Sequence, residues 1–136
     1  MKDSLTAGLT HQEKILITPE KCIDFMGDDL RVYSTPNMVT DIEQTCRNLM
    51  IQHADAGEDS VGVRVEIDHL GATLAGQTVT VDAKVTGVDG PRVSFEVVVH
   101  DELDKVGQAK HVRFAMDTEK QGVRLKKKAA KVAELS

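Results

Sequence analysis

The sequence predicts an α+β fold in which one long amphipathic helix packs against an antiparallel sheet. A helix start signal and a stripe of apolar residues at three- and four-residue spacing occupy residues 36–54. From residue 60 to 119 the apolar residues instead recur at every second position, which is the period of strands with one buried face. The helix offers an apolar stripe and the sheet an apolar face, so each can bury the other.

Length and composition predict one domain. The chain has 136 residues, with no Trp, one Tyr and three Phe. Its core must therefore consist of Val, Ile, Leu, Met and Ala, and the valines of the second half favour strands. We expect a single domain over residues 1–136, with its core at about 10–119 and a basic tail at 120–136.

The first third of the chain predicts one strand and an irregular connection. Residues 10–18 have the composition of a strand. Residues 19–33 contain Pro19, Gly27 and the pair Asp28-Asp29, so we expect an irregular connection with one helical turn.

The helix is predicted from Pro36 to about Ala54. Proline is favoured at the first helical position, and Thr35 before it is a suitable cap. One apolar stripe follows, made by Met38, Ile42, Cys46, Leu49 and Met50. The opposite side is polar and carries Thr40, Asp41, Gln44, Asn48 and Gln52.

Four alternating runs follow the helix and predict four strands. Their apolar positions are Val61, Val63, Val65 and Ile67; Val79, Val81, Ala83 and Val85; Val93, Phe95, Val97 and Val99; and Val112, Phe114 and Met116. The connections at 71–76, 89–91 and 102–105 are short enough for hairpins, so a four-strand meander is expected.

Charge and composition exclude several functional classes. The net charge of −5 argues against a protein that wraps nucleic acid. No apolar run approaches the roughly 20 residues of a membrane span, and no signal-peptide stretch follows Met1. Cys22 and Cys46 lack metal or disulfide spacing, so we expect reduced thiols in a cytoplasmic protein. The basic tail is most simply a solvated segment or short helix.

Two residues interrupt the apolar pattern and are candidates for chemistry. His69 is in line with Val65 and Ile67, so it should point toward the helix. Glu43 is at the margin of the helix's apolar stripe, so a carboxylate and an imidazole can face one buried space and act on an acyl group. The alternative is structural: Glu43 pairs with Arg47 on the helix surface, and His69 is a packed core histidine.

Other combinations are weaker candidates. His100, Asp101, Glu102 and His111 are metal-ligand types, but a solvated cluster explains them better, so no metal site is predicted. Cys46 and His69 could form a nucleophile and base, yet Cys46 lies within the apolar stripe. The chain contains no G-x-S-x-G elbow and no glycine-rich phosphate loop.

The sequence resembles the fluoroacetyl-CoA thioesterase group of hotdog proteins at these same residues. The matching segments are Val32-Tyr33-Ser34-Thr35-Pro36-Asn37-Met38-Val39, Ile42-Glu43-Gln44-Thr45-Cys46, Asp59-Ser60-Val61-Gly62, Ile67-Asp68-His69, residues 72–81 and His111-Val112-Arg113. The resemblance covers about two-thirds of the chain and implies a hotdog fold, with the central helix wrapped by the sheet.

The resemblance also implies roles for individual residues. The family's catalytic residues fall on Thr35, Glu43 and His69. Gly62 would offer a backbone N–H to the thioester oxygen, and Arg113 matches an arginine that supports the site. A homodimer with active sites at or near the interface is implied, with acyl-CoA as substrate and no separate cofactor.

The segment before the helix departs from the family pattern. The fluoroacetyl-specific enzyme has a lid of phenylalanines there, whereas this chain has Phe25, Leu30 and Tyr33. Asn37 stands where a phenylalanine is expected, and we place Tyr33 and Asn37 among the substrate-binding residues. The resemblance therefore extends to thioester hydrolysis but not to selectivity for fluoroacetate.

Four functions follow from these observations and can be distinguished. The first is an acyl-CoA thioesterase in which Glu43 is general base or nucleophile. The second is a hotdog module that binds acyl-CoA without hydrolysis, and another is a purely structural dimer. An enoyl-CoA hydratase on this fold needs a histidine five residues after a helical aspartate, but Cys46 follows Asp41 at that distance.

Overall fold

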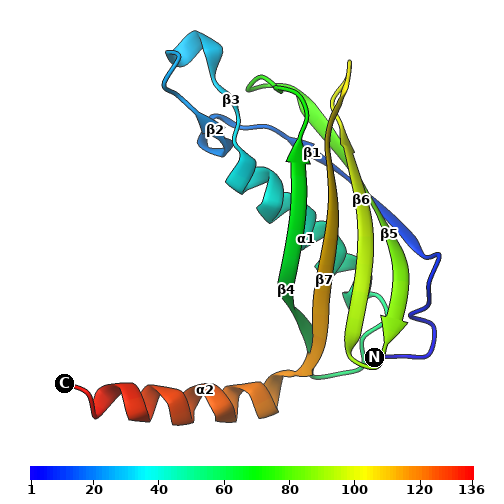
Figure 1. Ribbon diagram of the computed structural model, residues 1–136, viewed down its shortest axis with the longest axis vertical. Coiled ribbons are helices and arrows are strands. Elements are labelled where there is room, and N and C mark those ends of the chain that lie inside the picture. Colours follow the sequence, from blue (N-terminus) through cyan, green and yellow to red (C-terminus); the bar gives the residue numbers. More distant parts are fainter.

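A long helix lies against one face of a five-stranded antiparallel sheet (Figure 1). The computed structural model describes residues 1–136. The sheet has the order β1-β5-β6-β7-β4. Its strands are β1 (Thr10–Leu16), β4 (Glu58–His69), β5 (Thr78–Asp89), β6 (Arg92–His100) and β7 (Lys105–Asp117). The predicted α+β architecture is confirmed.

The predicted four-strand meander is wrong in one connection. β5, β6 and β7 are joined by hairpins as expected, but β4 pairs with β7 and forms the far edge of the sheet. Residues 70–77, which include the connection at 71–76 predicted as a hairpin, instead cross from β4 to β5. Eight residues reach about 26 Å when extended, which is more than enough to pass two intervening strands about 4.8 Å apart.

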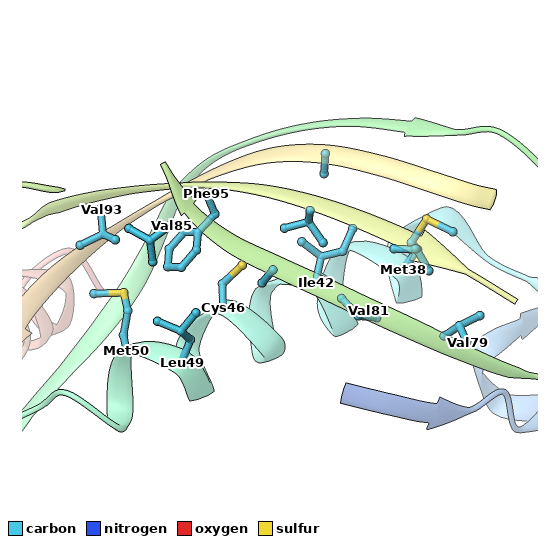
Figure 2. Close-up of a cluster of buried hydrophobic side chains, with 14 of the residues drawn as sticks. Met38, Ile42, Cys46, Leu49, Met50, Val79, Val81, Val85, Val93 and Phe95 are labelled. Carbon is cyan, nitrogen blue, oxygen red and sulfur yellow. The ribbon is translucent and has the colours of Figure 1, made fainter. Parts of the chain in front are cut away.

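The helix α1 (Thr35–Ile51) begins one residue before the predicted start and ends three residues before Ala54. Its cap is Ser34, whose hydroxyl accepts the Asn37 backbone N–H, so the prediction that Thr35 caps the helix is wrong. The predicted apolar stripe is buried, and Figure 2 shows it packed against valines of β5 and β6 and against Phe95. Asp41, predicted on the polar side, is also buried.

The strands β5 and β6 bury the residues predicted for them, whereas in β4 and β7 only Val112 is buried, and Ile67 and Met116 are half-buried. A bulge between Gly62 and Arg64 shifts the register of β4. As a result Gly62 faces the helix, while Val61 and Val63 are exposed. In β7 the helix-facing positions include His111 and Arg113, whereas Phe114, predicted on the buried face, is exposed.

The segment between β1 and α1 is more ordered than predicted. It contains two single-turn 3-10 helices, η1 (Pro19–Lys21) and η2 (Asp28–Leu30). Two short strands, β2 (Cys22–Ile23) and β3 (Val32–Tyr33), pair with each other. This segment stands at the N-terminal end of α1 (Figure 1).

The basic tail forms a second helix, α2 (Thr118–Ala133), rather than a short one. It leaves the end of β7 and points away from the sheet (Figure 1). Neither helix has the length and apolar character needed to cross a bilayer.

Candidate active site

The N-terminal end of α1 brings Thr35 to His69. Ser34 caps the helix, so the Thr35 hydroxyl is not used as a cap. It lies 2.8 Å from Nδ1 of His69, at the end of β4. The sequence placed the two residues 34 positions apart, and the packing of α1 on β4 joins them in one hydrogen bond.

His69 borders a surface pocket of about 500 Å³, which Tyr33, Thr35 and Leu70 also line. Burial lowers the pKa of His69, and a hydrogen bond with the Gly71 backbone opposes part of that effect. The imidazole is therefore neutral at pH 7. A neutral imidazole bonded to a hydroxyl can orient a substrate or pass a proton, but carries no permanent charge into the pocket.

Tyr33 and Asn37, predicted as substrate-binding residues, have partners within the chain. The Tyr33 hydroxyl donates to Asp41 at 2.5 Å, and its ring meets His69 edge-on with centroids 6.2 Å apart. Lys21 binds the other Asp41 oxygen at 2.8 Å. Asn37 donates its side-chain N–H to the Ser34 hydroxyl at 2.6 Å. Tyr33 thus presents its ring, not its hydroxyl, to the pocket.

Glu43 belongs to a second group of residues, farther along α1. Its carboxylate faces Gly62, where a Cβ atom would overlap Oε1 of Glu43. An Arg113 nitrogen lies 4.0 Å from the same oxygen. The Glu43 side chain is 42% exposed, so solvent reaches it while the Arg113 side chain behind it is buried.

Arg113 is held in place by Ser60 and His111. Its guanidinium donates to the Ser60 hydroxyl at 2.8 Å and to the Ser60 carbonyl at 3.0 Å. Another nitrogen is 3.2 Å from Nε2 of His111. Burial lowers the pKa of Arg113, and the charge of Glu43 acts against that lowering. An arginine remains protonated even so, and places a fixed positive charge behind the carboxylate.

His111 links this pair to the bulge of β4. Its Nε2 accepts from Arg113, so the proton is on Nδ1, which donates to the Arg64 carbonyl at 2.7 Å. Burial lowers the pKa of His111, which keeps the ring neutral in this arrangement. The side chain therefore fixes the bulge beside Gly62 and the position of Arg113 at once.

The two groups lie far apart in one chain. Gly62 is paired with Arg113 across the ladder, whereas His69 is paired with Gly107. Seven residues of β4 separate them, which is about 20 Å of strand. Glu43 and His69, predicted to face one buried space, therefore do not share one within a single chain: Glu43 lies beside Gly62 within β4, and His69 lies at the end of that strand.

Comparison with known proteins identifies the chain's relatives. The model of the fluoroacetyl-CoA-specific thioesterase family matches residues 17–119. The chain belongs to this family. Fluoroacetyl-CoA thioesterase of Streptantibioticus cattleyicolor is 30% identical over 135 residues, which is 94% of this chain and 97% of that protein.

Solved structures agree with this membership. A point mutant of the fluoroacetyl-CoA-specific thioesterase FlK superimposes with a TM-score of 0.85 at 29% identity, covering 93% of this chain and 99% of the other. A complex of that mutant with fluoroacetate and CoA gives a TM-score of 0.78 at 29% identity, with 85% and 98% covered. The fold is the hotdog fold, as the resemblance implied.

Within this thioesterase-family chain, sequence reasoning missed three residues of the site. The sequence suggests His111 as a metal ligand and as part of a matching segment, Ser60 as part of another matching segment, and Asp41 as a polar-face residue that a hydratase would use, but it predicts none of them as a site residue. His111 and Arg113 stand two apart in a strand, so they share a face. That spacing, once Arg113 was assigned to the site, was the signal that His111 accompanies it.

The other pairings and sites considered from the sequence do not form in the structure. Arg47 pairs with Asp59 through two hydrogen bonds of 2.9 and 2.6 Å, not with Glu43. Cys46 is buried, and burial raises the pKa of its thiol to about 12, so it is no thiolate nucleophile. No three His, Cys, Asp or Glu side chains are grouped as metal ligands, and Asp101 instead binds backbone amides of its own turn.

Proposed function

We propose that the protein hydrolyses small or medium acyl-CoA thioesters to the free acid and CoA. The observation that carries this proposal is the convergence of the Glu43 carboxylate, the Gly62 backbone and the buried Arg113 guanidinium. A carboxylate with a fixed cation behind it can act on a thioester carbonyl, and a backbone N–H can stabilise the oxyanion. Family membership and the CoA complex of FlK support the substrate class.

The proposed active unit is a homodimer formed through β4. This strand is the outer edge of the sheet, is 12 residues long, and exposes Val61, Val63 and Val65. Such an edge is a template for pairing with another strand. Antiparallel pairing of two copies about a two-fold axis near Glu66 would place Gly62 of one copy opposite the partner's His69.

This pairing would unite the two separated groups. Neighbouring strands are about 4.8 Å apart, so the partner's Thr35 and His69 would face Glu43 across the interface. Each dimer would then hold two equivalent composite sites. Arg113 orients Glu43 from behind, Gly62 offers its N–H to the oxygen, and the neutral His69–Thr35 pair orients the acyl group.

The first experiment is a free-thiol assay with an aromatic disulfide reporter. Acyl-CoAs from acetyl to octanoyl, together with phenylacetyl-CoA, are tested with wild type, Glu43→Ala and Gln44→Ala. Gln44 is the exposed neighbour of Glu43 on α1 and serves as the matched control. We expect wild type and Gln44→Ala to release thiol and Glu43→Ala to be inactive. A Glu43→Ala enzyme of near-normal rate would refute the role of Glu43.

Binding measurements separate the enzyme from a binding module. If wild type binds acyl-CoA saturably but releases no thiol across the whole panel, the chain is a non-catalytic acyl-CoA-binding protein. The chain's own residues suffice for the proposed hydrolysis, so we propose no cofactor beyond the CoA of the substrate.

The two possible roles of Glu43 predict different isotope patterns. A single turnover in H₂¹⁸O places the label in the acid product alone if Glu43 activates water. If Glu43 attacks the carbonyl and forms an anhydride, water can then attack the Glu43 carbonyl and leave the label on the enzyme. Mass spectrometry of the peptide that contains Glu43 distinguishes the two routes.

We place the enzyme in the cytoplasm. Cys22 and Cys46 are both free thiols, and Cys46 is buried among apolar residues. Reduced thiols are typical of that compartment. Recovery of the activity in a membrane or secreted fraction would contradict this placement.

A further inference from the structure

The helix α2 has no partner in a single chain. None of its residues is buried, and its connection to the domain consists of Asp117, which caps it, and Thr118, whose backbone N–H and hydroxyl both donate to the Gly57 carbonyl. An isolated helix of 16 residues that contains a glycine is marginal in water. A stable α2 therefore needs a surface to pack on.

Helical spacing divides α2 into two faces. Leu125, Ala129 and Val132 form an apolar stripe, and Lys126 and Lys128 flank it on either side. Leu125 and Val132 are 56% and 55% exposed. The opposite face is basic and carries Lys120, Arg124, Lys127 and Lys131. A surface that covers the stripe should be apolar with acidic residues beside it.

The turn between β6 and β7 has this character. Leu103, at its tip, is 83% exposed and lies between Glu102 and Asp104. The adjacent connection between β4 and β5 exposes Leu70 and Leu74. The distribution of charge also favours contact between the basic helix and the rest of a second copy. Residues 118–136 contain six basic and two acidic side chains, a net charge of +4. Because the whole chain has a net charge of −5, its other residues carry −9.

The turn of the same chain is out of reach for α2. β7 begins next to this turn and ends where α2 starts, and its 13 residues span about 40 Å. The two-fold pairing of β4 reverses the direction of the second copy. The partner's turn would then lie at the end of the sheet from which α2 departs, and α2 projects past β4 toward that side (Figure 1).

We propose that α2 is an arm that docks its apolar stripe on the turn 101–104 and the connection 70–77 of a second copy of this chain. This proposal rests on the two-fold dimer of the proposed function. Because the connection 70–77 follows His69 directly and its first three residues line the same pocket as His69, the arm would also support the histidine half of the composite site.

Hydrogen exchange measured by mass spectrometry on the full chain tests the arm. The variant Leu125→Glu/Val132→Glu keeps good helix formers but places two charges in the stripe. We expect exchange in α2 and in residues 70–77 and 101–104 to rise about tenfold, while β4 stays protected. Asp104→Lys, on the accepting turn, should also deprotect α2.

The matched control is Lys127→Gln/Lys131→Gln, which changes the net charge by the same amount on the basic face. This variant should leave exchange in both loops unchanged. If the stripe variant leaves the loops unchanged while β4 is protected, the arm is refuted and the dimer stands. If β4 of the wild type exchanges freely at every concentration, the dimer fails and the arm with it. Protection of α2 only on addition of anionic phospholipid vesicles would refute the arm and assign it to a lipid surface.

Discussion

Each polar atom that lies on the buried face of β7 has a partner, and this makes single residues there sensitive to change. Arg113 bonds to Ser60 and His111, and His111 bonds to the Arg64 carbonyl. No buried side-chain nitrogen or oxygen lacks a hydrogen bond. Removing one member would leave another unpaired at a cost of about 1–3 kcal/mol. The same contacts hold Glu43 beside Gly62, so stability and activity depend on one cluster.

Gly62 should tolerate no side chain. An added Cβ would overlap the Glu43 carboxylate oxygen, so Gly62→Ala must displace the proposed catalytic group. We expect kcat to fall about a hundredfold, as misplacement by about 1 Å can cost that much. Gly87→Ala is the control, because a Cβ there meets nothing within 4 Å. Steady-state kinetics of both variants provide the measurement, and equal rates would contradict the crowding of Glu43.

His69 and His111 should make the protein less stable in acid. Burial lowers the pKa of both imidazoles below the unfolded value of about 6.5. The unfolded chain therefore binds more protons, and the stability present above pH 6.5 is lost as the pH falls through the folded pKa values. Urea unfolding at pH 7.5 and 5.5 should show a smaller free energy of unfolding at the lower pH.

Two substitutions test whether a buried histidine causes this pH dependence of the free energy of unfolding. His111→Asn keeps a donor for the Arg64 carbonyl but does not titrate, so its stability should vary less between these pH values. His100→Gln replaces an exposed histidine and should keep the wild-type dependence. If the free energy of unfolding of His111→Asn changes with pH as much as that of the wild type, His111 does not contribute to the pH dependence.

Among the elements, α1 begins with two adjacent residues of different roles, one that stabilises the helix and one that belongs to the candidate site. The Ser34 hydroxyl caps the helix, whereas the neighbouring Thr35 hydroxyl bonds to His69. Both residues are typical caps, so the sequence could not distinguish them. The packing of β4 on the start of α1 decided which hydroxyl caps and which reaches the histidine.

A substitution at Ser34 should therefore lower stability, whereas a substitution at Thr35 should lower activity. Ser34→Ala should destabilise the protein by about 1 kcal/mol. Thr35→Val should change stability by no more than about 0.5 kcal/mol, since it removes no cap. Its kcat should fall roughly ten- to a hundredfold because His69 loses its partner. Thermal unfolding and the thiol assay, run on both proteins, test the separation.

The sequence was informative wherever one periodicity was unbroken. Residues 79–85 alternate without interruption and residues 93–99 do so except at Val98, and the apolar residues predicted to be buried in both runs are buried. In β4 the bulge at Gly62 adds a residue without a signal in the hydrophobic pattern, so the predicted face failed there. In β7, buried His111 and Arg113 looked like solvent positions, because their partners lie on β4, about 50 residues away.

The residues of the candidate site come from pattern and resemblance, and their arrangement in space could not be predicted. Thr35, Glu43 and His69 were identified from pattern and resemblance, and the structure joins Thr35 to His69. The separation of Glu43 from His69 along β4 depends on strand pairing, which hydrophobic alternation does not encode. The crossing of residues 70–77 was missed for the same reason.

At the scale of the whole molecule, each active site of the proposed two-fold dimer contains residues of both chains. One site would use Glu43 of the first chain and His69 of the second. The separate variants Glu43→Ala and His69→Ala should each be inactive as homodimers. Mixed and reassociated, half of the dimers would combine one of each chain and regain one intact site.

The mixture should recover about a quarter of the wild-type activity, since each mixed dimer holds one working site of two. Unfolding and refolding the two variants together, followed by the thiol assay, measures the recovery. The control is the same mixture combined without reassociation. Activity that stays at the level of the separate variants would contradict a site shared between chains.

The single tyrosine gives the site its own optical signal. The chain has no Trp and one Tyr, so nearly all absorbance near 280 nm arises from Tyr33. This ring is buried, bonded to Asp41 and edge-on to His69. A ligand that enters beside His69 changes the surroundings of that one chromophore. Occupancy of the pocket can therefore be followed in the unlabelled protein by tyrosine emission.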